Sequence, residues 1–357
     1  MDKKKVIVFT GGGTAGHVTP NIAIMNALDQ ERWTFHYIGS HQGIEKELIT
    51  NNGVPYHGIS SGKLRRYIDL ENIKDPFRVL KGIWEARKIL QSLKPQVVFS
   101  KGGFVSVPVV IAAKTLGIPV FLHESDITPG LANRIAKWFA AKIFTSFEET
   151  AAYFPKKKTY VVGSPIREDL FLGDTEKGKA LMGFYDDRPI LTIMGGSLGS
   201  KRINEAVREV LPELLKEFQV MHLCGKGNIE RKLEIVSGYK QVEYLHDELP
   251  DILAATDYVI TRGGSNAIFE FLSLHKPMLI IPLPENQSRG DQILNAKSFA
   301  KNGFCLFLEE KNLVTSSLLA HLRKLQREAN DMKQKMGEYD KKDAVALLAA
   351  AINEIDH

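Results

Sequence analysis

Short apolar runs alternate with longer segments of helical periodicity along the whole chain. The runs predict strands at 6–9, 35–38, 97–99, 120–123, 143–145 and 160–162 in the first half, and at 190–194, 220–223, 242–244, 258–261 and 278–281 in the second. The segments 204–217 and 265–274 are typical of helices. Strands that are apolar on both faces are typical of parallel sheets covered by helices. The pattern therefore predicts an α/β protein with doubly wound sheets.

One short pattern occurs twice in the chain. The strand at 6–9 runs into the sequence GGTAG at 12–16, and the strand at 190–194 runs into GGSLG 183 residues later. A helical segment follows each turn, and the offset is close to half the chain. We predict two Rossmann-like domains that face a cleft, with ligand at the carboxyl ends of the strands. The N-terminal domain spans 1–163, the C-terminal domain spans 164–340, and a C-terminal helix at 341–357 packs back on the N-terminal domain.

Composition and charge narrow the class of protein. The chain has 357 residues, 25% charged residues and a formal net charge of +5, which excludes a disordered chain, a collagen-like repeat and a coiled coil. No apolar run approaches the roughly 18 residues of a membrane span, and the apolar stretch after the basic N-terminus is too short for a secretory signal. We expect the protein in the cytoplasm. Cys224 and Cys305 cannot form a disulfide framework and are expected to be buried.

Glycine-rich turns indicate a phosphate-bearing ligand. The spacing Gly11-x-Gly13-x-x-Gly16 matches the dinucleotide fingerprint. A dehydrogenase also needs a carboxylate at the end of the second strand, and the strand at 35–38 is followed by none, so a nicotinamide cofactor is disfavoured. A third turn, with Gly102 and Gly103, follows the strand at 97–99. Three such turns at strand ends favour a pyrophosphate over a purely structural role for the glycines.

The run TRGGSNAIFE at 261–270 is the most informative part of the second half. A strand ends at a glycine pair, Ser265 is predicted to cap the following helix, and Glu270 lies about one and a half turns inside it. A carboxylate at this place can accept two hydrogen bonds from a ribose diol. The alternative is a solvated glutamate. No Asp-x-Asp pattern occurs in the chain, so we expect no metal and no other cofactor.

The sequence resembles the MurG family of peptidoglycan N-acetylglucosaminyltransferases over essentially the whole chain, and an ordered set of motifs carries the resemblance. The motifs are GGGTAGHVTP at 11–20, SKGGFVSVP at 100–108, HESD at 123–126, GSPIR at 163–167, GGSLG at 195–199, the Glu270 helix, and DQILNA at 291–296. The resemblance implies a GT-B fold, UDP-N-acetylglucosamine as donor, and lipid I, an undecaprenyl-pyrophosphoryl-N-acetylmuramoyl-pentapeptide, as acceptor. It implies a β-1,4 linkage formed with inversion.

The resemblance also implies which residues contact the donor. They are Thr14, Ala15, Gly16, Arg167, Ser197, Leu245, Ser265, Asn266, Ala267, Glu270 and Gln292. The chain departs from many relatives at one donor-sugar position, where it has Asp126 in place of asparagine. Asp126 is kept among the candidate donor contacts, although an ionised aspartate accepts hydrogen bonds and cannot donate them as asparagine does.

Inverting transfer needs a group that removes the proton of the attacking hydroxyl. His17 is the leading candidate, because histidine titrates near neutral pH and this one follows a glycine turn. Glu124 is the second candidate. Helix N-termini and Arg167 can neutralise the departing UDP without a metal. A UDP-sugar epimerase, another glycolipid glycosyltransferase and a non-catalytic nucleotide-sugar sensor remain as alternatives.

A basic segment suggests how the enzyme reaches a lipid acceptor. Residues 63–94 include nine basic and four acidic residues. Phe77, Leu80 and Trp84 recur at helical spacing beside Arg78 and Lys81. Either these apolar side chains pack inward, or they enter the interface of an anionic membrane while the bases contact its headgroups. We favour the second, with the protein at the cytoplasmic face of the membrane as a peripheral protein, and we expect no nucleic-acid partner.

Overall fold

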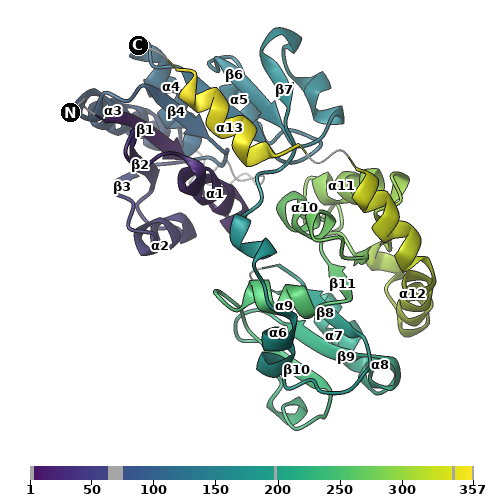
Figure 1. Ribbon diagram of the computed structural model, residues 1–357. Helices are drawn as coiled ribbons and strands as arrows, with labels where there is room; N and C mark the ends of the chain where they lie inside the picture. The colour runs from purple at the N-terminus through teal and green to yellow at the C-terminus, as the bar shows by residue number, and fades with distance from the viewer. Residues whose placement is uncertain (1–3, 63–74, 197–198, 340–341, 356–357) are drawn as a thin grey trace. The chain divides into compact units, whose positions relative to one another are not determined.

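The computed structural model of the chain describes residues 4–62, 75–196, 199–339 and 342–355. The chain forms two compact units (Figure 1). Unit 1 comprises Met1–Arg167 and Lys342–His357, and unit 2 comprises Glu168–Lys341. Each unit is an α/β layer structure with its own parallel sheet.

The sheet of unit 1 has the strand order β3-β2-β1-β4-β5-β6-β7, and all its pairs are parallel. The strands are β1 (Lys5–Thr10), β2 (Trp33–Ser40), β3 (Tyr56–Ile59), β4 (Val97–Ser100), β5 (Val120–Glu124), β6 (Lys142–Thr145) and β7 (Thr159–Val161). The order reverses between β1 and β4, which is where open α/β sheets bind ligands.

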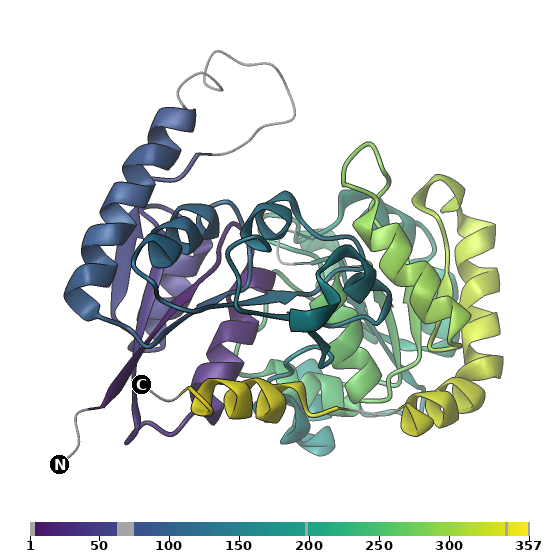
Figure 2. The ribbon, with the colours of Figure 1, turned by 90° about the horizontal axis from the view of Figure 1, so that it is seen from above.

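Helices cover both faces of this sheet, because its strands are apolar on both sides. They are α1 (Thr19–Ala27), α2 (Ile44–Asn51), α3 (Asp75–Leu93), α4 (Ser106–Thr115), α5 (Leu131–Ala136) and α13 (Ala344–Asn353), with one-turn helices η1 (Ala15–His17), η3 (Glu149–Tyr153) and η4 (Lys156–Lys158). Ala86 and Leu90 of α3 are buried on one face. On the other face α13 lies beside α1, and Leu348 joins the same core as Ile24 (Figure 2).

Unit 2 repeats the architecture with the strand order β10-β9-β8-β11-β12-β13. Its strands are β8 (Ile190–Met194), β9 (Gln219–Leu223), β10 (Tyr239–Val242), β11 (Tyr258–Thr261), β12 (Met278–Ile280) and β13 (Cys305–Phe307). Its helices are α6 (Thr175–Met182), α7 (Lys201–Glu209), α8 (Leu211–Glu217), α9 (Leu249–Ala255), α10 (Ser265–Ser273), α11 (Asp291–Lys301) and α12 (Thr315–Glu338), with η5 (Glu168–Phe171), η6 (Arg231–Leu233) and η7 (Glu310–Asn312).

The doubly wound α/β class is confirmed, and three details of the sequence prediction are wrong. The helix expected at 204–217 is two helices, because Pro212 begins a new helix in the first turn of α8. The strand expected at 242–244 lies earlier, at β10. Strands β3 and β13 were missed, because β3 is short and largely half-buried and β13 spans three residues.

Two further observations bear on membranes and disulfides. Among the residues that the structure describes, no helix combines the length and the apolar character that crossing a lipid bilayer requires. Cys224 and Cys305 are both buried free thiols, as predicted.

Candidate functional site

Two glycine-rich loops leave neighbouring strands of unit 1 at the same edge of the sheet. β1 pairs with β4 so that Thr10 lies beside Ser100, and each loop therefore starts next to the other. The loops are in close contact at Gly12 and Gly103, where a Cβ atom on Gly103 would lie 2.3 Å from the carbonyl oxygen of Gly12. The φ of 81° at Gly103 is also left-handed. The structure thus brings the first and third predicted glycine loops together.

The first loop ends in η1, which carries Ala15, Gly16 and His17. Nδ1 of His17 lies 3.0 Å from the carbonyl oxygen of Gly12 and 3.1 Å from the hydroxyl of Thr14. Because a carbonyl oxygen can only accept, this contact places the proton of the neutral ring on Nδ1. The lone pair is then on Nε2, which is the ring nitrogen that can accept a proton in this tautomer.

A buried carboxylate that the sequence analysis missed supports the first loop. Glu45 on α2 is 1% exposed, and its carboxylate accepts hydrogen bonds from the backbone N–H of Gly13 at 3.2 Å and from the hydroxyl of Ser40 at 2.5 Å. The hydroxyl of Tyr37 donates to the carbonyl of Gly11 at 2.8 Å. Strand β2, through Tyr37, and helix α2, through Glu45, therefore hold the backbone of the first loop in place. A glutamate in an amphipathic helix gives no sequence signal of such a contact.

Glu124 organises the turn that follows β5. It is 5% exposed, and its oxygens accept from the N–H of Asp126 at 3.0 Å, the N–H of Gly130 at 3.1 Å and the side-chain amide of Asn133 at 2.9 Å. Burial, with a smaller contribution from the charge of Asp126, raises the pKa of Glu124. Asp126 itself is half-buried. The structure thus places both predicted carboxylates in one turn, at the same sheet edge as the glycine loops.

A buried lysine lies beneath this turn. Lys101, directly after β4, is 2% exposed, and its ammonium lies 2.5 Å from Nδ1 of His123 and donates to the hydroxyl of Ser125. On the other side of its ring, His123 contacts the carbonyl of Gly163 through Nε2 at 3.1 Å. Burial lowers the pKa of Lys101 to about 7, against the opposing effect of Glu124 and Asp126. In the sequence this lysine stands out only as part of the SKGGFVSVP motif at 100–108.

In unit 2 a glycine pair joins β11 to α10. The structure places Gly264 at the N-cap position and Ser265 as the first helical residue, so the prediction that Ser265 caps the helix is wrong. Gln292 on α11 accepts the backbone N–H groups of Gly263 at 3.2 Å and Leu283 at 3.0 Å through its carboxamide oxygen. Its carboxamide oxygen is thus engaged by the protein, and its hydrogen-bond donor is the amide N–H₂ group.

A buried arginine, also missed, fixes the same loop. The guanidinium of Arg262 contacts the carboxylate of Glu310 at 2.5 Å, the carbonyl of Ile281 at 3.0 Å and the hydroxyl of Ser200 at 2.5 Å. Ser200 caps α7 by accepting from the N–H of Ile203. Arg262 therefore connects the loop before α10 to the start of the helix that follows the second GG turn.

The other predicted donor residues are distributed between the two units. Arg167 is the last residue of the first segment of unit 1, and it is half-buried. Asn266, Ala267 and Glu270 are half-buried on α10, and half-buried Leu245 packs against the apolar core beside β10. Ser197 lies outside the described residues. Within the described parts of the chain, no group of three His, Cys, Asp or Glu side chains is arranged to hold a metal ion.

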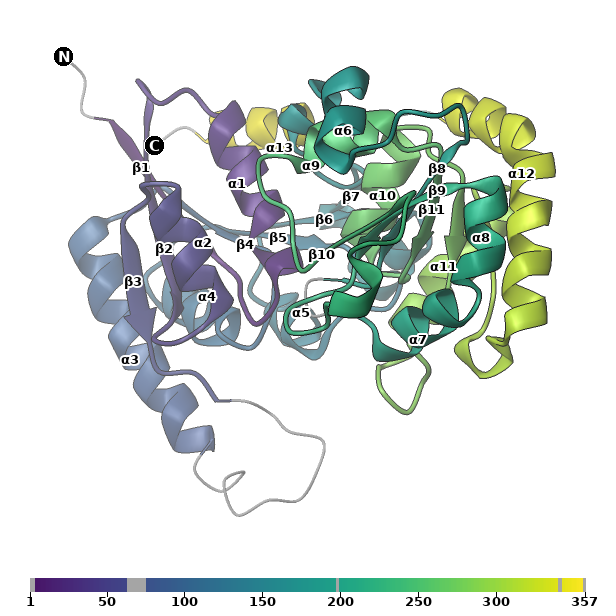
Figure 3. The ribbon, with the colours of Figure 1, turned by 90° about the horizontal axis from the view of Figure 1, so that it is seen from below.

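Helix α3 presents its predicted apolar side chains to solvent. Phe77, Leu80 and Trp84 are 72%, 64% and 56% exposed. The opposite face of the helix packs along α4 (Figure 3). The side chains of Arg78 and Lys81, 45% and 66% exposed, lie on the same helix. The alternative in which the three apolar residues pack into the core is therefore wrong. Residues 63–74 of the basic segment lie outside the described part of the chain.

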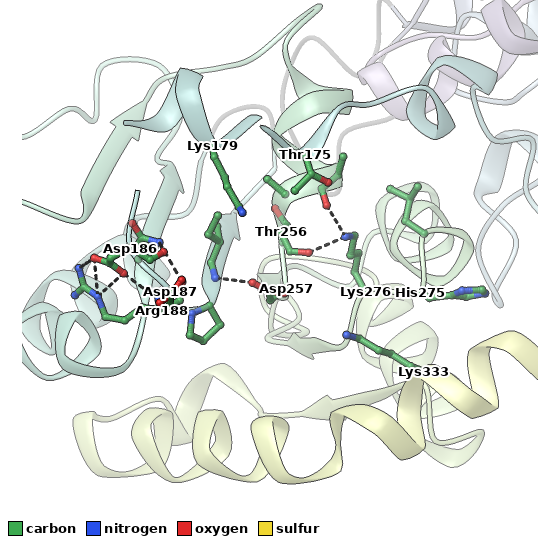
Figure 4. Close-up of a pocket in the computed structure, with 16 residues that line it drawn as sticks. Thr175, Lys179, Asp186, Asp187, Arg188, Thr256, Asp257, His275, Lys276 and Lys333 are labelled. Atoms are coloured by element: carbon green, nitrogen blue, oxygen red, sulfur yellow. Dashed lines mark hydrogen bonds and ion pairs between the residues drawn. The ribbon is translucent and has the colours of Figure 1, made fainter. Parts of the chain in front are cut away.

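Unit 2 also has a cavity of about 570 Å³ (Figure 4). It is lined by Ile190 and Gln219, the first residues of β8 and β9, and by Lys276 and Lys333, so it opens at the amino ends of the strands. Among the described residues, none of the predicted site residues lines it. The candidate site instead follows the carboxyl ends of the strands in both units.

Comparison with known proteins identifies the family. Residues 7–145 match the N-terminal domain of glycosyltransferase family 28, and residues 190–350 match its C-terminal domain. A *Bacillus cereus* protein named UDP-N-acetylglucosamine–N-acetylmuramyl-(pentapeptide) pyrophosphoryl-undecaprenol N-acetylglucosamine transferase 2 is 57% identical over 98% of this chain and 99% of its own length. A *Shouchella clausii* protein named as the same transferase is 56% identical with the same coverage.

Solved structures show the same fold at lower identity. MurG from *Acinetobacter baumannii* matches with a TM-score of 0.77 at 23% identity, over 99% of this chain and 100% of that one. A UDP-GlcNAc 2-epimerase from *Neisseria meningitidis* matches with a TM-score of 0.68 at 14% identity and the same coverage. These likenesses confirm the predicted fold class of two Rossmann-like domains, and the epimerase likeness concerns the fold alone.

Proposed function

This chain belongs to the MurG family within glycosyltransferase family 28, and we infer from that membership that it transfers N-acetylglucosamine from UDP-N-acetylglucosamine to lipid I. The acceptor atom is the C4 hydroxyl of the N-acetylmuramoyl unit, and the product is lipid II, the precursor of peptidoglycan. The observation that carries this conclusion is an identity of 57% over 98% of the chain to a transferase of that name. The epimerase and sensor alternatives have no comparable support.

Unit 2 supplies the groups that suit the donor nucleotide. The N–H groups at the start of α10 suit phosphate oxygens, because the helix dipole adds to their attraction for anions. Glu270, further along α10, accepts from the ribose hydroxyls. The amide of Gln292 donates to the donor from the other side of the Gly263 loop, which its oxygen already fixes. The buried Arg262 keeps this loop in place and is not itself a donor contact.

His17 removes the proton of the attacking hydroxyl. Its Nδ1 contact with the Gly12 carbonyl supports this role, because it orients the ring and leaves the basic electron pair on Nε2. The oxygens of Glu124 accept three hydrogen bonds within its own turn. A carboxylate engaged in this way is a better organiser of the turn than a base.

The leaving group is stabilised by fixed charges and dipoles. As C1 is attacked by the hydroxyl oxygen, the bond from C1 to the UDP oxygen breaks and its electron pair goes to the diphosphate. Arg167 and the backbone N–H groups of the glycine loops neutralise this charge. The backbone N–H groups are held in place by the folded loops, so they need little rearrangement during the reaction.

The protein reaches its acceptor by docking reversibly on an anionic membrane through α3. The exposed Phe77, Leu80 and Trp84 support this, because apolar side chains beside Arg78 and Lys81 suit the interface of an anionic bilayer. Each base near such a surface contributes about 1 kcal/mol of attraction. The docked surface is the cytoplasmic leaflet, where the UDP-sugar is available.

One assay tests the function. Labelled UDP-N-acetylglucosamine is incubated with the protein, with and without a lipid I analogue, and the label is followed. Transfer of label to the lipid only when the analogue is present is the expected result. Release of UDP or epimerised sugar without acceptor would indicate an epimerase, and binding without any product would indicate a sensor.

A further inference from the structure

The buried Lys101 has no part in the mechanism above, yet it lies at the centre of the unit 1 site. Its ammonium contacts His123 on β5 and Ser125 in the turn after β5. Its backbone N–H donates to the carbonyl of Thr10 at the end of β1 at 3.0 Å. Lys101 thus connects β4 to β1 through its backbone and to β5 and the following turn through its side chain.

We propose that Lys101 is a positioning residue for transfer, and that its buried ammonium balances the carboxylates of Glu124 and Asp126 so that the Gly102–Gly103 loop can accept the acceptor's pyrophosphate. This role rests on the proposed function. Lys101 is 2% exposed and therefore does not touch substrate. It acts through the turn and the loop that it joins.

Electrostatics gives the reason for such a charge. A buried ammonium is costly unless an opposite charge is near, and both carboxylates favour the charged form of Lys101. The side-chain amide of Asn133, which bonds Glu124, would also lie 3.2 Å from a Cβ atom on Gly102. The carboxylate of Glu124 therefore lies close to the glycine loop, and that of Asp126 acts on Lys101 from the same turn. Without Lys101 they would repel an approaching pyrophosphate.

Hydrogen bonding fixes the orientation of the same cluster. The Nδ1 atom of His123 accepts from the ammonium of Lys101, so the ring proton is on Nε2 and donates to the carbonyl of Gly163. Burial, reinforced by the charge of Lys101, holds the pKa of His123 well below its usual range. The imidazole stays neutral, so the positive charge of this pair, when present, is on Lys101.

The test is a double-mutant cycle in the transfer assay. Lys101→Met should raise the acceptor KM by on the order of tenfold and leave the donor KM within about twofold, because two carboxylates are left unbalanced. Asp126→Asn in the Lys101→Met background removes one of those charges. The double variant should recover most of the lost acceptor affinity. Its change in acceptor KM should therefore be smaller than the product of the changes in the two single variants.

The pH profile adds a readout that a purely structural role would not change. The ionisable groups around Lys101 are His123, Glu124 and Asp126. The phenol of Tyr37 lies beyond Gly11, and burial raises the pKa of this phenol further above neutral. With its pKa near 7, Lys101 loses its charge as pH rises, so the acceptor kcat/KM should fall above neutral pH. Asp126→Asn should move this fall to lower pH, and Lys101→Met should abolish it.

Lys276 in unit 2 provides a matched control. It is also a largely buried lysine, donating to the carbonyls of Ala254 at 3.2 Å and Thr256 at 2.7 Å, and burial lowers its pKa to about 8 (Figure 4). Lys276→Met should lower the melting temperature and leave the acceptor KM unchanged. Adding Asp126→Asn to Lys276→Met should have the same effect on the acceptor KM as Asp126→Asn in the wild-type protein.

The possible failures are distinguishable. A wild-type chain that transfers nothing to lipid I would overturn the proposed function and the role of Lys101 with it. If the wild type transfers, then losses that multiply, equal rises in donor and acceptor KM, or an unchanged pH profile in Lys101→Met would overturn the role of Lys101 alone. Recovery in the double variant, together with the loss of the alkaline fall, would establish it.

Discussion

Carboxylates of one chemical type have different functions here according to what their oxygens contact. Glu45 and Glu124 accept hydrogen bonds from backbone and side-chain groups of their own unit, and both are nearly fully buried. Glu270 is half-buried on a helix that begins at a glycine pair. The first two are suited to holding loops, and the third is suited to meeting a ligand.

Replacing Glu270 tests the ribose contact. Glu270→Ala should raise the donor KM, because a charge-assisted, two-point hydrogen bond is lost at a cost of about 1.5–3 kcal/mol. Steady-state kinetics at saturating acceptor measures this change. Glu213→Ala, at an exposed position of α8, is the control and should leave the donor KM unchanged. A folded Glu270→Ala protein with the wild-type donor KM would contradict the assignment.

Replacing His17 tests the general base. His17→Ala should lower kcat by about 10²–10⁴-fold at saturating substrates, since positioned proton transfer contributes that much. His321 on α12 also uses Nδ1 to contact a backbone carbonyl, that of Ser317 at 2.7 Å, and His321→Ala serves as the control. Near-wild-type turnover in His17→Ala would mean that another group takes the proton.

At the scale of elements, hydrophobic pattern and glycine spacing predicted most strands and the sheet edge that carries the site. Pattern could not reveal which polar side chains the fold buries. Lys101, Arg262 and Glu45 look like surface residues in the sequence, and only the packing of neighbouring elements buries them and gives them partners. The sequence also could not predict whether Phe77, Leu80 and Trp84 are exposed. Apolar residues at helical spacing share one face of a helix, but their spacing does not determine whether the core covers that face.

The exposed stripe on α3 gives a prediction for that element. Phe77→Ser with Trp84→Ser should reduce binding to anionic vesicles and activity on membrane-embedded lipid I, and should spare a short-chain soluble analogue. Vesicle co-sedimentation over a salt series measures the binding, which should weaken as salt screens the basic residues.

The matched control for α3 lies in unit 2. Tyr185 and Ile235 are 82% and 90% exposed there. Tyr185→Ser with Ile235→Ser removes as much exposed apolar surface without touching α3, and vesicle binding should persist. Equal loss of activity on both acceptors in the α3 variant would show that its residues support the fold and do not dock.

At the scale of the whole molecule, the site residues are divided between two units. The proposed base, His17, and the Gly102–Gly103 loop proposed for the acceptor belong to unit 1, and the proposed ribose and phosphate contacts of α10 belong to unit 2. Transfer requires the C4 hydroxyl to reach C1, so the two units must come together around the substrates. The chain passes between them just after the segment 163–165, where Gly163 has a left-handed φ of 88°.

This division predicts that donor binding compacts the protein. Small-angle scattering should show a smaller radius of gyration with UDP-N-acetylglucosamine than without it, because bound donor favours the closed arrangement. In a donor titration of Glu270→Ala, compaction should need a higher donor concentration, in proportion to the rise in its KM, and should reach the same end point. Identical scattering with and without saturating donor would contradict closure. If Glu270→Ala becomes compact at the same donor concentration as the wild type, closure does not depend on the ribose contact. A ligand shifts a conformational equilibrium only through contacts that differ between the two states.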